Sequence, residues 1–160
     1  MAEHEDDHHR SATARDTGTR VGDDFRSGAG RDVVVLRMPA TGAYLSVLRT
    51  ATASLAARLD FTIDDIEDLR IAVDEACALL LTQAIPGADL ECTFELTADA
   101  IQVDVSVLTL DGQEPARDTF AWRVLTALAG EVGSSVDADQ RVTLWLYKRK
   151  TDPSVPGAPS

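Results

Sequence analysis

Apolar side chains recur with two different periods along this chain, and the change of period divides it into two halves. In residues 42–59, and again after Thr62, apolar residues stand three and four positions apart, which is the spacing of an amphipathic helix. Beyond the Pro-Gly pair at 86–87, residues 90–96 and 101–107 alternate apolar and polar side chains, which is typical of strands with one covered face. The first half therefore predicts helices, and the second half predicts mostly strands.

The second of the two helices has a clear start and a clear stop. Thr62 suits the N-cap position, and Asp64 and Asp65 stand in the first turn, where the helix dipole favours acidic residues. The Pro-Gly pair at 86–87 predicts that the helix ends near Ile85. These signals place a long helix directly after the first one.

Three further elements complete the expected order. Residues 33–38 form a β-rich run that ends at Pro39, residues 120–132 predict a third helix, and residues 141–149 predict a last strand. The order β-α-α-β-β-α-β predicts an α+β fold. We expect a two-layer sandwich in which the helices collect on one face of a mixed, mainly antiparallel sheet.

The two ends of the chain lack the apolar residues that a folded core requires. Residues 1–31 are rich in charged and small residues, and residues 151–160 contain Pro and Gly, so we expect two disordered tails around one folded domain at 32–150. The histidines all lie in the first tail, where a solvated cluster is a simpler interpretation than a metal site; they are His4, His8 and His9. The predicted domain therefore lacks histidine, which disfavours serine-hydrolase triads and His-mediated acid–base catalysis.

Length and charge narrow the class of protein further. The 160 residues suffice for one domain with a single core, and no apolar run approaches the roughly 20 residues that span a bilayer. The net charge of −12 argues against binding to nucleic acid or to anionic membranes. Cys77 and Cys92 stand in apolar surroundings and are expected to be buried free thiols, and the residue types predict no metal site. The N-terminus has no apolar stretch of the secretory type, which predicts a cytoplasmic protein.

Two segments of the predicted helices resemble a known family. The stretch Asp68-Leu-Arg-Ile-Ala-Val-Asp-Glu-Ala-Cys77, in this order of elements, resembles the anti-sigma factor kinases of the RsbW and SpoIIAB type, which are small members of the GHKL (histidine-kinase-like) ATPase superfamily. The stretch Trp122-Arg-Val-Leu-Thr-Ala-Leu-Ala-Gly-Glu-Val132 is similar to the helix that follows the ATP lid in that family. The resemblance covers residues 32–150.

The resemblance implies a role in transcription control. Proteins of this family bind an alternative sigma factor and keep it from RNA polymerase, and an anti-anti-sigma protein with a STAS domain competes for the same surface. Active members also bind ATP with Mg²⁺ and phosphorylate the anti-anti-sigma protein on a serine. Many relatives are homodimers, and the edge strand expected at 33–36 is compatible with one.

The positions that match the family's nucleotide site hold mostly other residue types. Glu75 matches the glutamate that serves as general base, but the Mg²⁺-binding asparagine falls on Leu79, which offers no oxygen ligand. The adenine-binding aspartate falls on Val107, and the two glycines of the lid fall on Thr119 and Ala121. The resemblance therefore implies that Glu75 is vestigial, that the other nucleotide positions are lost, and that no cofactor is bound.

Three functions from different classes stay open at this point. The first is an anti-sigma factor that works by protein binding and is released by simple competition. The second is an active serine kinase that uses ATP and Mg²⁺, which a four-residue insertion aligning Asp111-Gly112 with the family's aspartate would support. The third is an unrelated α/β domain with a small-molecule pocket. For the binding role, Arg49 on the first helix aligns with a partner-binding arginine of the family, and arginine is enriched at interface hot spots.

Charge and apolar spacing add one expectation each. Residues 32–150 hold 19 acidic and 10 basic side chains, and such a negative domain suits a basic, DNA-binding sigma factor. Three leucines in a row, Leu79 to Leu81, cannot share one helix face, so some apolar surface points toward the position of the ATP pocket. We expect that pocket to be collapsed or apolar.

Overall fold

The structure is a computed structural model, and it describes residues 30–152. The predicted tails and the histidine cluster lie almost wholly outside the described residues, so the boundaries at 32 and 150 stay predictions. Within the described range, no helix has both the length and the apolar character needed to cross a membrane. In the same range, no group of three or more His, Cys, Asp or Glu side chains is placed to hold a metal ion.

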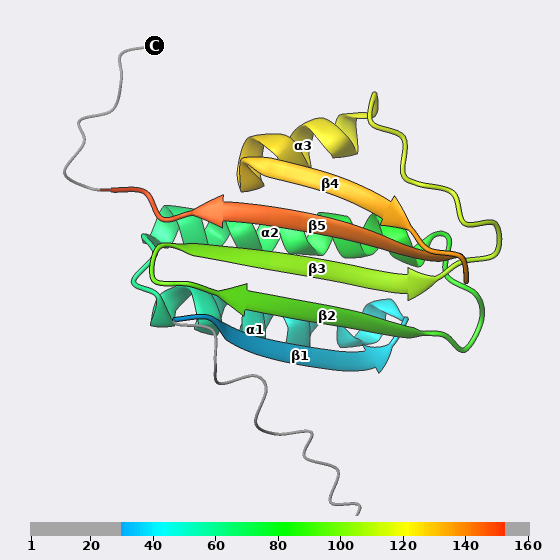
Figure 1. Ribbon diagram of the computed structural model, residues 1–160, viewed down its shortest axis with the longest axis horizontal. Helices are drawn as coiled ribbons and strands as arrows, with labels where there is room; N and C mark the ends of the chain where they lie inside the picture. The colour runs from blue at the N-terminus through cyan, green and yellow to red at the C-terminus, as the bar shows by residue number, and fades with distance from the viewer. Residues whose placement is uncertain (1–29, 153–160) are drawn as a thin grey trace, which may run out of the picture.

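Strands and helices of the described chain form two layers (Figure 1). The strands are β1 (Asp32–Pro39), β2 (Asp89–Leu96), β3 (Ala100–Leu108), β4 (Glu131–Val136) and β5 (Arg141–Arg149). The helices are the 3₁₀ turn η2 (Gly42–Tyr44), α1 (Leu45–Arg58), α2 (Ile63–Leu81) and α3 (Phe120–Ala129). The α-helices lie on one face of the sheet and leave the other face open, which confirms the predicted two-layer α+β sandwich.

The sheet has the strand order β1-β2-β3-β5-β4, and each neighbouring pair is antiparallel. The sheet expected to be mixed and mainly antiparallel is thus antiparallel throughout the described chain. Phe94 on β2 stands opposite Val103 on β3, which stands opposite Leu146 on β5. Because directly opposed residues share a face of the sheet, these three side chains lie in one row against the helices.

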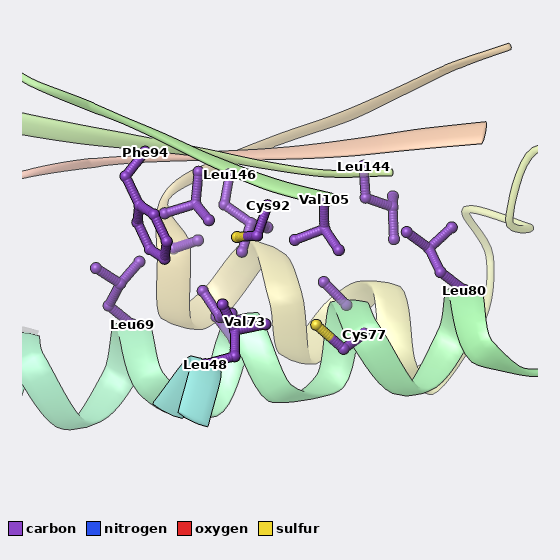
Figure 2. Packing of buried hydrophobic residues seen from close by; sticks show 14 of the residues in the cluster. Leu48, Leu69, Val73, Cys77, Leu80, Cys92, Phe94, Val105, Leu144 and Leu146 are labelled. Atoms are coloured by element: carbon purple, nitrogen blue, oxygen red, sulfur yellow. The ribbon is translucent and has the colours of Figure 1, made fainter. Parts of the chain in front are cut away.

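The alternation seen in the sequence defines the core. On β2 the inward residues Leu90, Cys92, Phe94 and Leu96 are buried, and the polar residues between them face the open side. Figure 2 shows Phe94 and Leu146 pointing from the sheet toward Leu69 and Val73 of α2, with Leu48 of α1 beside them. Burying each such side chain contributes about 1.5–3 kcal/mol, so this interface between layers is the main stabilising feature of the fold.

Helix α2 begins as predicted and ends earlier than predicted. The Thr62 Oγ1 accepts a hydrogen bond from the backbone N–H of Asp65 at 3.1 Å, which confirms the N-cap. The helix ends at Leu81 and not near Ile85, because the following residues turn to meet the end of the sheet. There the N–H of Ile85 donates to the carbonyl oxygen of Leu108 at 3.1 Å.

The prediction of a third helix as far as Val132 is wrong, since a strand follows the helix. Helix α3 ends at Ala129, because Gly130 adopts a φ of 89° that continues no α-helix and favours glycine. Strand β4 then pairs with β5. Its inward row is Val132, Ser134 and Val136, and the serine in the middle breaks the apolar alternation that marks the other strands.

Candidate functional site

The residue that matches the general base of the family lies in the middle of α2. Glu75 is half-buried there, and no described residue bonds to its side chain. The preceding residue is engaged: the Arg49 Nε on α1 donates to the Asp74 Oδ1 at 2.8 Å. This ion pair joins α1 to α2. The sequence did not reveal the role of Asp74, because 25 residues separate it from its partner.

Two positions of the nucleotide motif are taken up by core packing. Val107 on β3 is fully buried in the main hydrophobic cluster, and Leu79 on α2 is half-buried against the same cluster. Mg²⁺ requires oxygen ligands, and an adenine-binding group must reach its ligand, so neither side chain supplies the contact of its family counterpart. Helices α2 and α3 also pack against each other.

The Asp111-Gly112 pair forms a turn beyond the end of β3. Asp111 is exposed, and its Oδ1 accepts a hydrogen bond from the N–H of Gln113 at 3.4 Å. Gly112 has a φ of 62°, and its N–H donates to the Thr109 Oγ1 at 2.9 Å. These local bonds are ordinary turn chemistry, in which Asp bonds its own backbone and Gly supplies the positive φ.

The two positions of the lid glycines begin helix α3. The Thr119 Oγ1 accepts a hydrogen bond from the N–H of Trp122 at 3.2 Å, so Thr119 is the N-cap. Ala121 is half-buried in the first turn, and Phe120 between them is 80% exposed. Glycine at a helix start lets the backbone approach a phosphate closely, whereas these side chains fill that space and start the helix.

The loop between β3 and α3 has contacts of its own on β4 and α3. The Ser134 Oγ on β4 donates to the carboxylate of Glu114, and the Arg117 Nη2 lies 3.5 Å from the same carboxylate. The Arg117 Cζ also lies 5.2 Å from the centre of the Trp122 ring, which is a cation–π distance. The loop is therefore held by side-chain contacts at several points along its second half.

The shape of the surface agrees with this packing. Five hollows of the described chain have volumes between about 310 and 440 Å³. None of these five is lined by Glu75, Leu79, Val107, Thr119 or Ala121. Neither the residue types nor these hollows of the described chain fit ATP with Mg²⁺, and we therefore derive no chemical step through that pair.

A different surface is open to a partner, and we call it the α1 surface. It is the outer face of α1 with one arginine of α2, and its residues are Ser46, Val47, Arg49, Thr50, Ala51, Ala53, Ser54 and Arg70. Two adjoining hollows in it measure about 420 and 440 Å³. Helix α1 holds none of the 27 acidic residues of the chain. Depletion of acidic residues and the presence of arginine are typical of protein interfaces.

The two arginines of the α1 surface differ in the donors that they have left. Arg70 gives three hydrogen bonds to Glu67, from Nε to both carboxylate oxygens at 3.0 Å and from Nη2 at 2.6 Å. These bonds hold the pKa of Glu67 below its ordinary value. Arg49 bonds to Asp74 through Nε alone, so within residues 30–152 its two terminal nitrogens have no acceptor. Arg49 therefore keeps both terminal nitrogens for a partner carboxylate, whereas Arg70 already has Nε and Nη2 engaged with Glu67 and keeps only Nη1 wholly unused among the described residues.

A buried charge cluster lies at the start of α2, and no sequence motif indicates it. The Lys148 Nζ on β5 donates to the carbonyl oxygen of Leu128 at 2.9 Å and lies 3.4 Å from the Asp65 carboxylate. Burial disfavours the charged form of Asp65, but hydrogen bonds from Thr151 and Thr62 and the charge of Lys148 outweigh it, so its pKa lies below the ordinary value. The cluster is structural, because it ties α2, α3 and the end of β5 together.

Both cysteines are buried free thiols, as predicted. Burial raises the pKa of the Cys77 thiol to about 12 and the pKa of Cys92 well above its ordinary value. Because the thiolate is the nucleophilic form, neither side chain is a reactive cysteine at neutral pH.

The fold defines the class of protein: a small two-layer α+β sandwich with a five-stranded antiparallel sheet. It matches the crystal structure of the RsbU and RsbW domains of a Mycobacterium tuberculosis protein with a TM-score of 0.61. The match covers 76% of this chain and 33% of that chain at 16% sequence identity, so it supports the fold alone.

Sequence comparison identifies the family within that class. The anti-sigma-F factor RsbW of M. tuberculosis is 34% identical over 111 residues, which is 69% of this chain and 66% of the relative. The serine-protein kinase RsbW of Halalkalibacterium halodurans is 32% identical over 90 residues, and that of Bacillus velezensis is 44% identical over 78 residues. No family model matches the chain. The chain belongs to the RsbW-type family, which confirms the predicted resemblance and excludes an unrelated α/β domain.

The matches cover only part of the relatives. The chain spans 66% of the mycobacterial protein, 54% of the H. halodurans protein and 49% of the B. velezensis protein. The names of these relatives include both anti-sigma factors and serine-protein kinases. Membership of the family therefore leaves the activity and the partners of this chain to be argued from its own residues.

Proposed function

We propose that this chain is an anti-sigma factor that sequesters an alternative sigma factor by protein binding, without ATP-dependent phosphorylation. A STAS-domain anti-anti-sigma protein releases the sigma factor by competing for the same surface. Family membership supports the class of partner, since one relative is named an anti-sigma-F factor. The negative charge of the chain, −12, supports a basic partner such as a DNA-binding sigma factor.

One observation carries the proposal that phosphorylation is absent. The resemblance assigns Val107 to the position of the family's adenine-binding aspartate, and the Val107 side chain is fully buried in the hydrophobic cluster. A nucleotide could reach this position only if the core opened. Phosphoryl transfer depends on positioning and on metal-assisted charge stabilisation, and a lone Glu75 provides neither. The retained glutamate is then a remnant of an active ancestor.

The α1 surface is the proposed docking site. Arg49 stands in it with both terminal nitrogens free among the described residues, and Asp74 holds the guanidinium in place through Nε. A partner carboxylate can accept two parallel hydrogen bonds from such a fork. The nearby small side chains of α1 leave room for a partner backbone.

The test of partner binding uses Arg70 as a matched control. Each sigma factor of the source genome is expressed separately and titrated with the full chain. One of them is expected to bind, and Arg49→Ala should weaken that complex at least tenfold, about 1.4 kcal/mol. Arg70→Ala removes an arginine from the same surface that is already paired with Glu67 through Nε and Nη2, so the loss should stay below about threefold. Equal losses in the two variants would contradict the assignment of Arg49.

The competing function is tested with the STAS proteins. Each is incubated with the chain, Mg²⁺ and γ-labelled ATP, and the label on the STAS protein is counted. We expect no transfer above the level of a Glu75→Gln control. Transfer that depends on Glu75 would establish the alternative, an active serine kinase of this family.

The homodimer implied by the resemblance stays a prediction. Strand β1 is at the edge of the sheet, and Val33 and Val35 on its open face are 40% and 54% exposed. An exposed edge strand can pair with a second chain. Sedimentation of the purified chain measures the oligomeric state directly.

A further inference from the structure

The open face of the sheet carries a hollow of about 320 Å³ that the proposed function does not use. It is lined by Gln102 of β3, Glu131 of β4, and Trp145 and Tyr147 of β5, and we call it the aromatic hollow. Tyr147 stands opposite both Gln102 and Glu131, so three of these side chains form one row across the sheet. In the next row, Trp145 stands between Asp104 and Gly133. The α1 surface lies on the opposite, helical side of the sheet (Figure 1).

Gly133 keeps the Trp145 ring in place in this hollow. A Cβ built on Gly133 would lie 2.1 Å from Cζ2 of the indole, so the ring occupies the space where a side chain of β4 would stand. Gly133 is itself buried. Its φ is not positive, so close approach of the ring, and no special backbone conformation, accounts for the glycine. The lack of a side chain at Gly133 therefore allows the Trp145 indole to contact the backbone of β4.

Charge is distributed unevenly over the open face. On the β1–β2 side, the carboxylates of Glu91 and Glu95 are neutralised by Arg37 at 2.7 Å and Arg31 at 3.1 Å. On the β3–β5–β4 side, no described cation forms an ion pair with Glu131 or with Asp104. Asp104 accepts one hydrogen bond at 2.9 Å, from the amide of Gln102.

We propose that the aromatic hollow binds an arginine side chain from a basic segment of a partner protein. Two unpaired carboxylates flank two aromatic rings, and a guanidinium can stack on a ring while it forks to a carboxylate. The Gln102 amide uses its N–H on Asp104, which leaves its carbonyl oxygen as a further acceptor. The lining thus supplies a carboxylate, a carbonyl oxygen and two ring faces to a cation, beside the N–H and O–H donors of the Trp145, Tyr147 and Gln102 side chains.

The chain itself already places one guanidinium at the rim of this hollow. The Arg149 Cζ lies 5.9 Å from the centre of the Tyr147 ring, and its Nη1 lies 3.5 Å from Asp99. The hollow repeats this combination of ring and carboxylate with Trp145 and Glu131, and Asp104 stands beside it opposite Trp145, without a cation paired to either carboxylate among the described residues. No described residue supplies that cation, and we assign it to a partner protein, as a guanidinium of the kind that Arg149 places on Tyr147.

The test measures the fluorescence of Trp145, which should change when a peptide binds in the aromatic hollow. In a Trp122→Phe variant, Trp145 is the remaining tryptophan, since the chain has two. The probe is an acetylated and amidated peptide of four Gly-Arg repeats, and the control peptide has citrulline, which is uncharged and nearly isosteric, in place of arginine. We expect saturable quenching by the arginine peptide at low salt and a response at least fivefold weaker with the citrulline peptide. Should Trp122→Phe unfold the chain, the indole N–H signals of the unmodified protein, assigned with Trp145→Phe, replace fluorescence.

Two carboxylate variants decide the site. Glu131→Gln should raise the half-saturating peptide concentration at least fivefold, whereas Glu91→Gln removes the same charge from the neutralised side of the open face and should change it less than twofold. Equal effects of the two variants would mean that the peptide reads net charge only, and the proposal would be wrong. It would also be overturned if the two peptides acted alike, or if the Trp145 signal did not respond to millimolar arginine peptide.

Discussion

The residues of the nucleotide-motif region, which are Leu79, Val107, Thr119 and Ala121, contribute to the fold, whereas the residues of the α1 surface are exposed to a partner. In the first, the positions that the resemblance assigns to nucleotide binding hold Val107, Leu79 and a helix-capping Thr119, and each of them serves the fold. In the second, Arg49 keeps unused donors at a half-exposed position and contributes to the fold through a single ion pair. Residues in one region stabilise this protein, and residues in the other are available to a partner.

The difference leads to a clear experimental contrast. Substitutions in the nucleotide-motif region should change stability strongly and leave partner binding intact wherever the chain stays folded. Substitutions on the α1 surface should do the reverse.

The largest effect is expected at Val107. Val107→Asp restores the residue type of active relatives but places a carboxylate in the core, where no described group is available to pair with it. Val107→Ala, the control for lost volume, should lower the free energy of unfolding by about 2 kcal/mol. The aspartate should cost at least about 2 kcal/mol more. Urea denaturation measures both, and a stable Val107→Asp variant that gained ATP binding would refute the assignment of this position to the core.

Substitution of the buried Asp65 should have an intermediate effect on the free energy of unfolding, and this effect should depend on pH. Asp65→Asn removes the charge that faces Lys148 and should cost about 2 kcal/mol at pH 7, whereas Asp64→Asn, at an exposed neighbour, should cost far less. Because the folded-state pKa of Asp65 is lowered, its contribution is present above the ordinary pKa of about 4 and is lost as the pH falls through the lowered value. The stability difference between wild type and Asp65→Asn should therefore narrow below about pH 4, and a difference that is constant with pH would contradict the pairing.

The helix cap gives a smaller effect. Thr119→Ala removes the acceptor for the N–H of Trp122 and should lower the free energy of unfolding by about 1 kcal/mol. Thr126→Ala, on an exposed turn of the same helix, loses only a hydroxyl that bonds to the carbonyl oxygen of Trp122 and is the matched control. Equal decreases in the free energy of unfolding of the two variants would mean that Thr119 does not stabilise α3 as an N-cap.

The smallest effect on stability is expected on the α1 surface. The Arg49 and Asp74 side chains are 41% and 36% exposed, and ion pairs of this kind contribute less than about 1 kcal/mol. Arg49→Ala should therefore unfold at nearly the wild-type urea concentration while it loses the partner affinity described above. A stability loss above about 2 kcal/mol would make Arg49 a structural residue and would remove the contrast between the regions.

The sequence predicted an element correctly where its residues have a strong local preference, as in alternating strands and at helix caps. The period-two runs of β2 and β3 placed the core, and Thr62 with its acidic neighbours placed the start of α2. Strand β4 was missed because its inward row contains Ser134 and because Gly133 is explained only by the tryptophan ring that lies on it. The helix stop at Gly130 was readable, but the resemblance to a family helix favoured a longer element.

Of the candidate site, the sequence alone could predict only those properties that follow from the residue types. Leucine and valine cannot bind Mg²⁺ or adenine through a side-chain oxygen, and this holds in any fold. The partners of Arg49, Lys148 and Trp145 are far away in sequence, so the Asp74 pair, the buried charge cluster and the aromatic hollow became visible only once the strands and helices were placed.

We propose that this fold binds protein and no longer binds a nucleotide, and calorimetry of the full chain with ATP and Mg²⁺ is the decisive test. The titration is run at a chain concentration at which a micromolar complex would give a complete isotherm, beside an active RsbW kinase as the positive control. We predict no saturable heat up to millimolar ATP. A saturable isotherm with a dissociation constant in the micromolar range would contradict the account and establish that the nucleotide site still works.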